Sequence, residues 1–185
     1  MKKPRTRSKR ARQSKPQIKS STGRHRIFTI GHEGVALDEV MGALKEAKVS
    51  VLVELRYHAS KSFDRVGFTR AELHKACEAA GIEYRCKDQP LAAPEVVVEA
   101  LEREDYRNAW NSYEAAIDTA NAFCEIDKLH KEAKVSNVCL LGETADHRIC
   151  HRHIASARIG HSKSSIFAFD IINLRCNGQR ALIPN

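Results

Sequence analysis

The sequence contains no long run of apolar residues and no acidic residue in its first 26 positions. No stretch approaches the roughly eighteen consecutive apolar residues that a membrane-spanning helix needs. No apolar segment follows the basic N-terminal residues, as a secretory signal would require. We therefore expect a protein without membrane contact that resides in the cytoplasm, or in the nucleus if the source is eukaryotic.

Paired cysteines are also missing, because no two of the six cysteines have Cys-x-x-Cys spacing. In a chain without a secretory signal the compartment is expected to be reducing, and free thiols are the default. We therefore expect no disulfide framework among these residues, which are Cys77, Cys86, Cys124, Cys139, Cys150 and Cys176.

Positive charge is concentrated at the N-terminus, where residues 1–26 hold eleven of the 31 Lys and Arg residues. Subtracting these eleven charges from the overall +8 leaves −3 for residues 27–185. The segment is poor in apolar side chains, so we expect residues 1–25 to form a disordered tail. Such a tail either binds nucleic-acid phosphates or is a solvated extension. The candidate contacts are Lys2, Lys3, Arg5, Arg7, Lys9, Arg10 and Arg12.

Strand-like and helix-like patterns alternate from Arg26 onward. β-Branched and apolar runs predict strands at residues 26–30, 49–55, 82–86, 135–141 and 166–172. Helical spacing predicts helices at residues 37–47, 69–81, 94–133 (broken near Glu104-Asp105) and 150–159. Thr69 and Glu72 form a capping box, Gly81 ends that helix, and Asn177-Gly178 indicates a hairpin turn.

This alternation predicts a single compact α/β domain at residues 26–185, with a mostly parallel sheet flanked by helices on both faces. Ligands of such sheets bind at the carboxyl ends of the strands. The loops after Leu55 and Leu141 leave such ends and hold many of the polar residues. In the long helical region we expect these side chains to face inward: Leu101, Trp110, Tyr113, Ile117, Ala120, Phe123, Cys124 and Leu129.

Four short motifs follow one another in a familiar order: Thr29-Ile30-Gly31-His32, Val53-Glu54-Leu55-Arg56, Gly81-Ile82-Glu83-Tyr84 and Cys150-His151-Arg152. Together they resemble the bacterial and archaeal domain-of-unknown-function-488 (DUF488) family, in which Cys-His-Arg is a signature element. The resemblance extends from about residue 27 to about residue 170. It implies a compact α/β fold and leaves the activity open.

The chain departs from the pattern of that family at four places. Gly142 stands where a cysteine usually ends the strand before the signature, and Glu143 lies one place early for the usual acid. Glu54 replaces an aspartate, and Leu91-Ala92-Ala93 replaces a Leu-Gly-Gly turn. We interpret the chain as a divergent member that lacks the second thiol of any chemistry requiring two facing cysteines.

Two arginines are candidates for binding an anion. Arg56 leaves a buried strand, where its guanidinium could hold a phosphate or carboxylate, or form a salt bridge that pins a loop, for instance to Glu143. Arg152 lies in the first turn of a helix, where backbone N–H groups favour anions and a cation opposes the helix dipole. With His32 after the first strand, these arginines predict a pocket for phosphate or a nucleotide-like small anion.

The candidates for catalysis lie beside these arginines. Cys150 precedes a helix among basic residues, which favours a nucleophilic or redox-active thiolate, although a free cysteine is more often a small buried hydrophobe. His151 could act as a general acid or base, or bond a backbone carbonyl and cap a loop. Glu54 and Glu143 are further candidates for proton transfer.

A metal site is a weaker interpretation of the same stretch. His147, Cys150, His151 and His153 are ligand types that zinc accepts. Neighbours one and two apart on a helix do not share a face, so these side chains would point in different directions. We expect neither a metal nor another cofactor.

Three functions remain open from the sequence. The first is an enzyme acting on a phosphate-bearing substrate, either a nucleotide or a base within nucleic acid. The second is a non-catalytic nucleic-acid-binding protein that uses its basic tail, and the third is a thiol-based sensor centred on Cys150. The sequence leaves the oligomeric state open.

Overall fold

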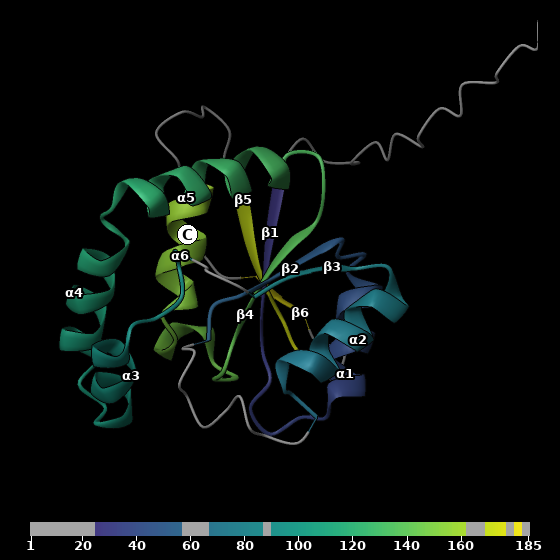
Figure 1. The fold of residues 1–185 in the computed structure, drawn as a ribbon, viewed down its shortest axis with the longest axis horizontal. Helices are drawn as coiled ribbons and strands as arrows, with labels where there is room; N and C mark the ends of the chain where they lie inside the picture. Colours follow the sequence, from purple (N-terminus) through teal and green to yellow (C-terminus); the bar gives the residue numbers. More distant parts are fainter. Residues whose placement is uncertain (1–24, 57–66, 87–89, 162–168, 177–179, 183–185) are drawn as a thin grey trace, which may run out of the picture.

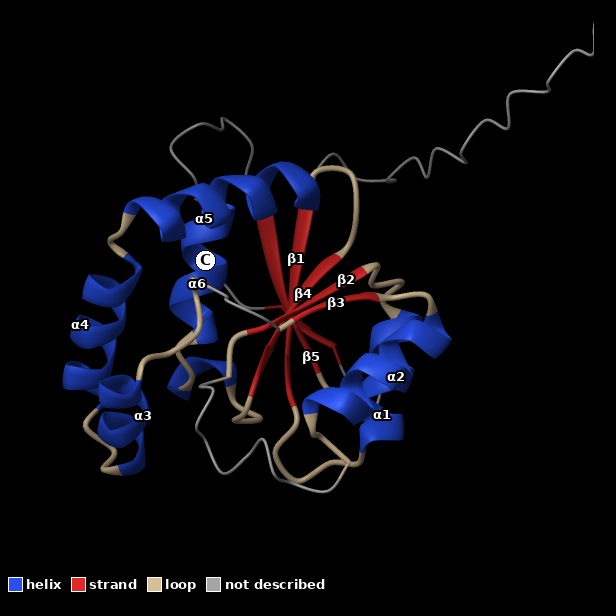
Figure 2. Cartoon of the chain, viewed as in Figure 1, coloured by secondary structure: helices blue, strands red, loops and turns tan. Residues whose placement is uncertain are grey.

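The computed structural model describes residues 25–56, 67–86, 90–161, 169–176 and 180–182. These residues form one sheet with helices on both faces (Figures 1 and 2), which confirms the predicted α/β class. Residues 1–24 of the predicted tail and the predicted Asn177-Gly178 turn lie outside the described residues. No helix in the described ranges is long and apolar enough to cross a membrane.

The sheet has the strand order β3-β2-β4-β1-β5-β6, in which β1 to β5 are parallel and β6 is antiparallel to β5. Because β4 lies between β2 and β1, the carboxyl ends of these three strands are neighbours at one edge. The strands are β1 (His25–Gly31), β2 (Val51–Glu54), β3 (Glu83–Arg85), β4 (Val138–Gly142), β5 (Phe169–Leu174) and β6 (Arg180–Leu182).

Two layers of helices cover the sheet (Figure 1). One face carries α1 (Leu37–Glu46) and α2 (Arg70–Ala80). The other carries α3 (Glu95–Glu102), α4 (Tyr106–Ile117), α5 (Ala120–Ala133) and α6 (Arg152–Gly160), the last preceded by a short 3-10 turn, η2 (His147–Ile149).

Side chains of the strands contribute to one hydrophobic core on each face of the sheet. Alternate side chains of β4 enter opposite cores, with Val138 and Leu140 on the α3–α6 side and Cys139 and Leu141 on the α1–α2 side. Every residue of β2 and β4 is buried, as expected for central strands covered on both faces. Burial on both faces fixes the register of these strands, and thereby the positions of the loops that leave them.

Both ends of α2 have the capping interactions that the sequence predicts. The Thr69 hydroxyl accepts a hydrogen bond from the Glu72 N–H, and the Glu72 carboxylate accepts one from the Thr69 N–H. Gly81 ends the helix with φ of 68°, a left-handed conformation that glycine adopts without strain. The predicted capping box and helix end are therefore confirmed.

The long helical region is interrupted twice. The predicted break near Glu104 is present, and a second one follows Ile117, where the Thr119 side chain accepts a hydrogen bond from the Ala122 N–H. The second break restarts the helical phase, so that α5 buries Ala122, Ile126 and Leu129. The prediction that Ala120, Phe123 and Cys124 face inward was therefore wrong, and all three are exposed.

The loop after β4 folds tightly over the end of β1. The backbone N–H groups of His32 and Glu33 donate to the Glu143 carbonyl at 3.1 and 2.9 Å. A Cβ on Gly31 would lie 2.0 Å from the carbonyl oxygen of Thr144, so only glycine permits this approach. This contact holds the loop that precedes the Cys-His-Arg element against the carboxyl edge of the sheet.

Candidate functional site

The first polar cluster at the carboxyl edge is built around Arg56, which is 2% exposed. Its Nε donates to one carboxylate oxygen of Glu54, and the hydroxyl of Tyr84 donates to the other. Its Nη2 donates to the carbonyl of Phe68 at 3.0 Å, and Nη1 lies 3.3 Å from Nε2 of His32. Arg56 thus forms a salt bridge with Glu54 and joins the end of β2 to the residues before α2.

The hydrogen bond from Arg56 fixes the tautomer of His32. A guanidinium can only donate, so Nε2 of His32 accepts and the ring carries its proton on Nδ1. The imidazole also stacks on Phe68, with ring centroids 4.5 Å apart. Burial, followed by the nearby Glu54 carboxylate, raises the pKa of Tyr84, so its phenol stays protonated. In this cluster the positive charge of Arg56 is therefore balanced by Glu54.

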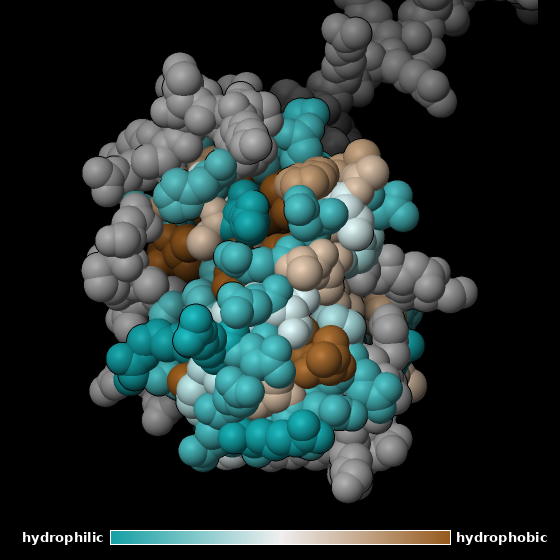
Figure 3. All heavy atoms as spheres, turned by 90° about the vertical axis from the view of Figure 1, so that its left-hand side faces the viewer, coloured by the Kyte–Doolittle hydropathy of each residue, from teal (hydrophilic) through white to brown (hydrophobic). Residues whose placement is uncertain are grey.

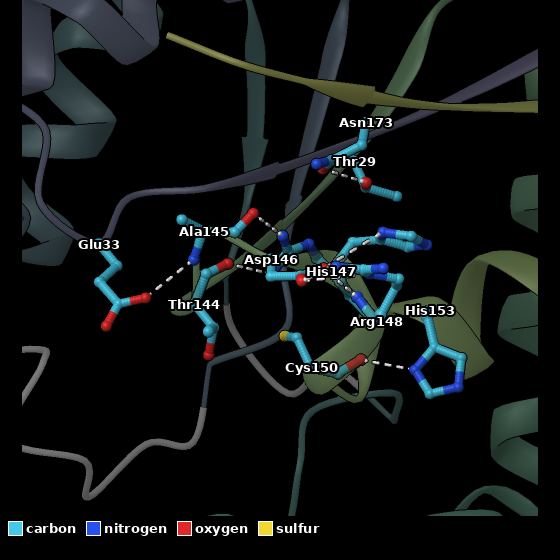
Figure 4. A network of polar contacts seen from close by, with 11 residues as sticks. Thr29, Glu33, Thr144, Ala145, Asp146, His147, Arg148, Cys150, His153 and Asn173 are labelled. Atoms are coloured by element: carbon cyan, nitrogen blue, oxygen red, sulfur yellow. Dashed lines mark hydrogen bonds and ion pairs between the residues drawn. The ribbon is translucent and has the colours of Figure 1, made fainter. Parts of the chain in front are cut away.

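The second cluster is built around Arg152, whose side chain has no exposed surface. Its Nη1 donates to the Thr144 carbonyl at 2.6 Å and its Nη2 to the Ala145 carbonyl at 3.1 Å. Its Nε is buried without a hydrogen-bond partner among the described residues. Figure 4 shows the residues of the loop from Thr144 to Arg148 close to Cys150. A buried cation held by carbonyl dipoles strongly favours a negative charge beside it.

The thiol of Cys150 lies beside that cation. A Cβ on Gly142 would be 2.8 Å from the Cys150 sulfur and 3.0 Å from Nη1 of Arg152, so both groups border the same small space. Burial alone would raise the pKa of this thiol. The charge of Arg152, the His151 imidazole and the Arg152 backbone N–H outweigh burial and lower the pKa to about 6. Cys150 is therefore mainly a thiolate at neutral pH.

His151 is oriented to exchange a proton with Cys150. Its Nε2 lies 2.8 Å from the Leu55 carbonyl, which can only accept, so Nε2 carries a proton. In the neutral ring, Nδ1 is then the acceptor, and it lies 3.9 Å from the Cys150 sulfur. The ring of Tyr113 packs against the imidazole at 5.0 Å, and the Tyr113 hydroxyl donates to the Leu91 carbonyl. A thiol beside a base that a third group orients is the arrangement of nucleophilic cysteines.

Other residues singled out from the sequence lie around these clusters. The side chain of Glu143 is exposed, and its backbone carbonyl is what ties the loop to His32. Burial, followed by the charge of Arg152, lowers the pKa of His147 to about 4 and keeps this ring neutral. The His153 Nδ1 donates to the Cys150 carbonyl at 2.9 Å. Within the described ranges, no group of three or more His, Cys, Asp or Glu residues could hold a metal ion.

The contacts of the two arginines belong to different clusters. Arg56 joins Glu54 and His32, whereas Arg152 joins Cys150 and the loop after β4. A phosphate held by both arginines stays a prediction, and so does the proton-transfer role of Glu54. The predicted salt-bridge alternative for Arg56 is present, with Glu54 rather than Glu143 as the partner.

Sequence reasoning missed three features of this site. The Leu55 carbonyl that orients His151 belongs to the backbone, so no side chain signals it. The contact of Tyr113 with His151 joins α4 to the start of α6, which only the fold brings together. The third is the close approach of Cys150 and Arg152 to Gly142. This feature did carry a sequence signal, because a glycine in a buried strand often marks a close approach.

A comparison with known protein families gives a match over much of the chain. Residues 36–159 match the model of a family described as "Domain of unknown function DUF488". This range contains β2, β4 and the Cys-His-Arg element, and with them both arginine clusters except His32. No curated protein and no solved structure matches the chain.

The lowered pKa of Cys150 predicts a pH-dependent contribution to stability. The folded state releases the thiol proton at about pH 6, whereas an ordinary cysteine does so near pH 9. The stabilisation is therefore complete above about pH 9 and is lost as the pH falls through about 6. Urea unfolding should show a free-energy difference between the parent and Cys150→Ala that grows by up to about 1.4 kcal/mol per pH unit within this window.

The exposed Cys124 supplies the matched control, because its thiol is solvated in both the folded and the unfolded state. Cys124→Ala should differ from the parent by a constant amount from pH 6 to pH 9. Parallel stability profiles for the parent and Cys150→Ala would show that the fold does not stabilise the thiolate.

Proposed function

We propose that this chain, which belongs to the family described as domain of unknown function DUF488, is an enzyme whose reactive group is the Cys150 thiolate and whose substrate bears a phosphate. The observation that carries this proposal is the Cys150–His151 pair beside the buried Arg152. The substrate class is a nucleotide or a base within nucleic acid. The site lies at the carboxyl edge of a parallel sheet, where ligands of such folds bind.

The proposed reaction begins from the Cys150 thiolate, with the proton that it has released held on Nδ1 of His151. The sulfur then uses an electron pair to bond an electrophilic carbon or phosphorus atom of the substrate. The bond from that atom to the leaving group breaks, and the leaving group takes the bonding pair and the proton from His151. Water gives a proton to His151 and its oxygen bonds the substrate atom, which breaks the bond to sulfur and restores the thiolate.

The charge on Arg152 supports an anionic substrate. Among the described residues no carboxylate pairs with this guanidinium, so carbonyl oxygens and the thiolate compensate its charge. When the sulfur enters a covalent bond, its negative charge moves to the substrate. Arg152 would then stabilise that charge in a site with little water, where such an interaction is strong.

Covalent labelling tests the proposal on the full-length protein. The protein is treated with iodoacetamide or with iodoacetate between pH 5 and pH 9, and the modified cysteines are located by mass spectrometry. We expect Cys150 to react half-maximally near pH 6, because this is where its thiolate forms. Relative to iodoacetamide, the anionic reagent should favour Cys150 over Cys124, and inorganic phosphate or adenosine 5′-monophosphate should protect Cys150.

His151→Gln should shift the labelling profile of Cys150 to higher pH, while Cys124 serves as the internal control on the same molecules. Labelling of Cys150 only above about pH 8 would contradict a thiolate enzyme. Labelling near pH 6 without protection by phosphate or nucleotide, together with rapid oxidation by hydrogen peroxide, would favour the thiol-based sensor instead.

The basic N-terminal segment favours a second candidate function, nucleic-acid binding through residues 1–25. Its positive charges would release counterions from a nucleic acid and raise the local concentration of this polymer without selecting a sequence. The variant that tests it is the full-length chain with Lys or Arg replaced by Gln at seven positions: Lys2, Lys3, Arg5, Arg7, Lys9, Arg10 and Arg12.

Fluorescence anisotropy with labelled single-stranded DNA and RNA measures the effect of this variant. We expect binding by the parent that weakens steeply with salt, and a shallower slope of log Kd against log salt for the variant. Equal affinities and equal slopes for both proteins would show that these seven residues do not contribute to nucleic-acid binding.

A further inference from the structure

Three aromatic residues of α4 lie on the face of this helix that turns toward the start of α6. Tyr106, Trp110 and Tyr113 are spaced four and three residues apart, which places them on one side of the helix. The Tyr113 ring contacts His151 at a centroid distance of 5.0 Å, and the Trp110 ring contacts His153 at 4.8 Å. We call Tyr106, Trp110 and Tyr113 the aromatic stripe.

The aromatic stripe leads from the surface to the reactive cysteine. Tyr113 is fully buried, whereas Trp110 and Tyr106 are half-buried. His153, which meets Trp110, donates from Nδ1 to the carbonyl of Cys150 at 2.9 Å. One imidazole therefore separates the Trp110 ring from the backbone of the nucleophile.

The outer part of the stripe is suited to receive a further ring. Trp110 meets His153 at an interplanar angle of 83°, so these two rings are perpendicular. Tyr106 lies 6.0 Å from Trp110 at 31°, a tilted contact in which the rings are not stacked. Where its residues are described, the side of the molecule that includes α3 and α4 is mostly hydrophilic with separate hydrophobic patches (Figure 3). A half-buried aromatic pair on such a side offers π surface to a planar ligand.

We infer that Tyr106 and Trp110 form a stacking surface for the base of a nucleotide whose reacting atom lies over Cys150. The inference rests on the proposed function, which places a phosphate-bearing substrate at Cys150. It adds a subsite that binds the planar base of the nucleotide rather than its phosphate. Stacking tolerates any of the bases, because each presents a π face, so the subsite would select for a base without selecting which one.

The sequence contains one tryptophan, so Trp110 reports directly on this subsite. The full-length protein is titrated with each of the four ribonucleoside 5′-monophosphates and, separately, with ribose 5-phosphate. The fluorescence lifetime is recorded, because a lifetime is insensitive to absorption of light by the nucleotide. We expect a saturable decrease of the Trp110 lifetime with at least one nucleotide and no change with ribose 5-phosphate.

Tyr106→Ala retains the tryptophan and removes half of the stacking surface. We expect this variant to bind the nucleotide about 5- to 100-fold more weakly, as expected when one base-stacking ring is lost. Tyr106→Phe keeps a ring and should bind like the parent. Phe123→Ala is the matched control, because Phe123 is an exposed aromatic residue on α5 and its loss should leave the affinity unchanged.

Two results would overturn the inference. One is no lifetime response to any nucleotide, or an equal response to ribose 5-phosphate. The other is unchanged affinity in Tyr106→Ala while circular dichroism shows a folded protein. Neither result affects the pH profile for labelling of Cys150, so failure of the base subsite is distinguishable from failure of the thiolate.

Discussion

The guanidinium of Arg152 carries its positive charge in a side chain with no exposed surface, and the surrounding structure is arranged to compensate it. The carbonyls of Thr144 and Ala145 accept its hydrogen bonds, which requires the loop after β4 to curl back over β1. Gly31 permits that loop to approach, and Gly142 leaves room for the guanidinium itself. The Cys150 sulfur supplies negative charge when it is ionised. The reactive state of the cysteine is thus a consequence of how a buried cation is held.

Strand order brings the rest of the site to this cation. Because β4 lies between β1 and β2, the loop that ends in Cys150 is flanked by His32 after β1 and by Glu54 and Arg56 at the end of β2. The Leu55 carbonyl beyond β2 then fixes the tautomer of His151. A base oriented by the backbone directly after a central strand needs no carboxylate partner.

Much of the frame of this site is predictable from the sequence, because it depends on local chemistry. Capping residues, helix-ending glycines and buried β-branched runs locate most elements, and the rule for parallel sheets indicates the correct edge. The error at Phe123 arose because a break after Ile117 restarts the helical phase, and the sequence signal for that break is the cap at Thr119.

The partners of the charged residues are harder to predict. Glu54 is the last residue of β2 and Arg56 lies two residues later, so the alternation of side chains in a strand predicts both on the same side, and this pairing was available from the sequence. The partners of Arg152 are backbone carbonyls eight and seven residues earlier, and they become neighbours only when the loop closes over Gly31. A contact of this kind follows from tertiary structure rather than from residue type.

The most direct measurement is a pH titration of the ¹³Cβ chemical shift of Cys150, in protein labelled at cysteine and assigned by comparison with Cys150→Ser. This shift reports the ionisation of a buried thiol without requiring access for a reagent. A midpoint at about pH 6 is the result expected if Arg152 and His151 stabilise the thiolate. A midpoint at about pH 9 or higher would mean that the fold does not stabilise the thiolate of Cys150, and it would contradict the assignment of this residue as the reactive group.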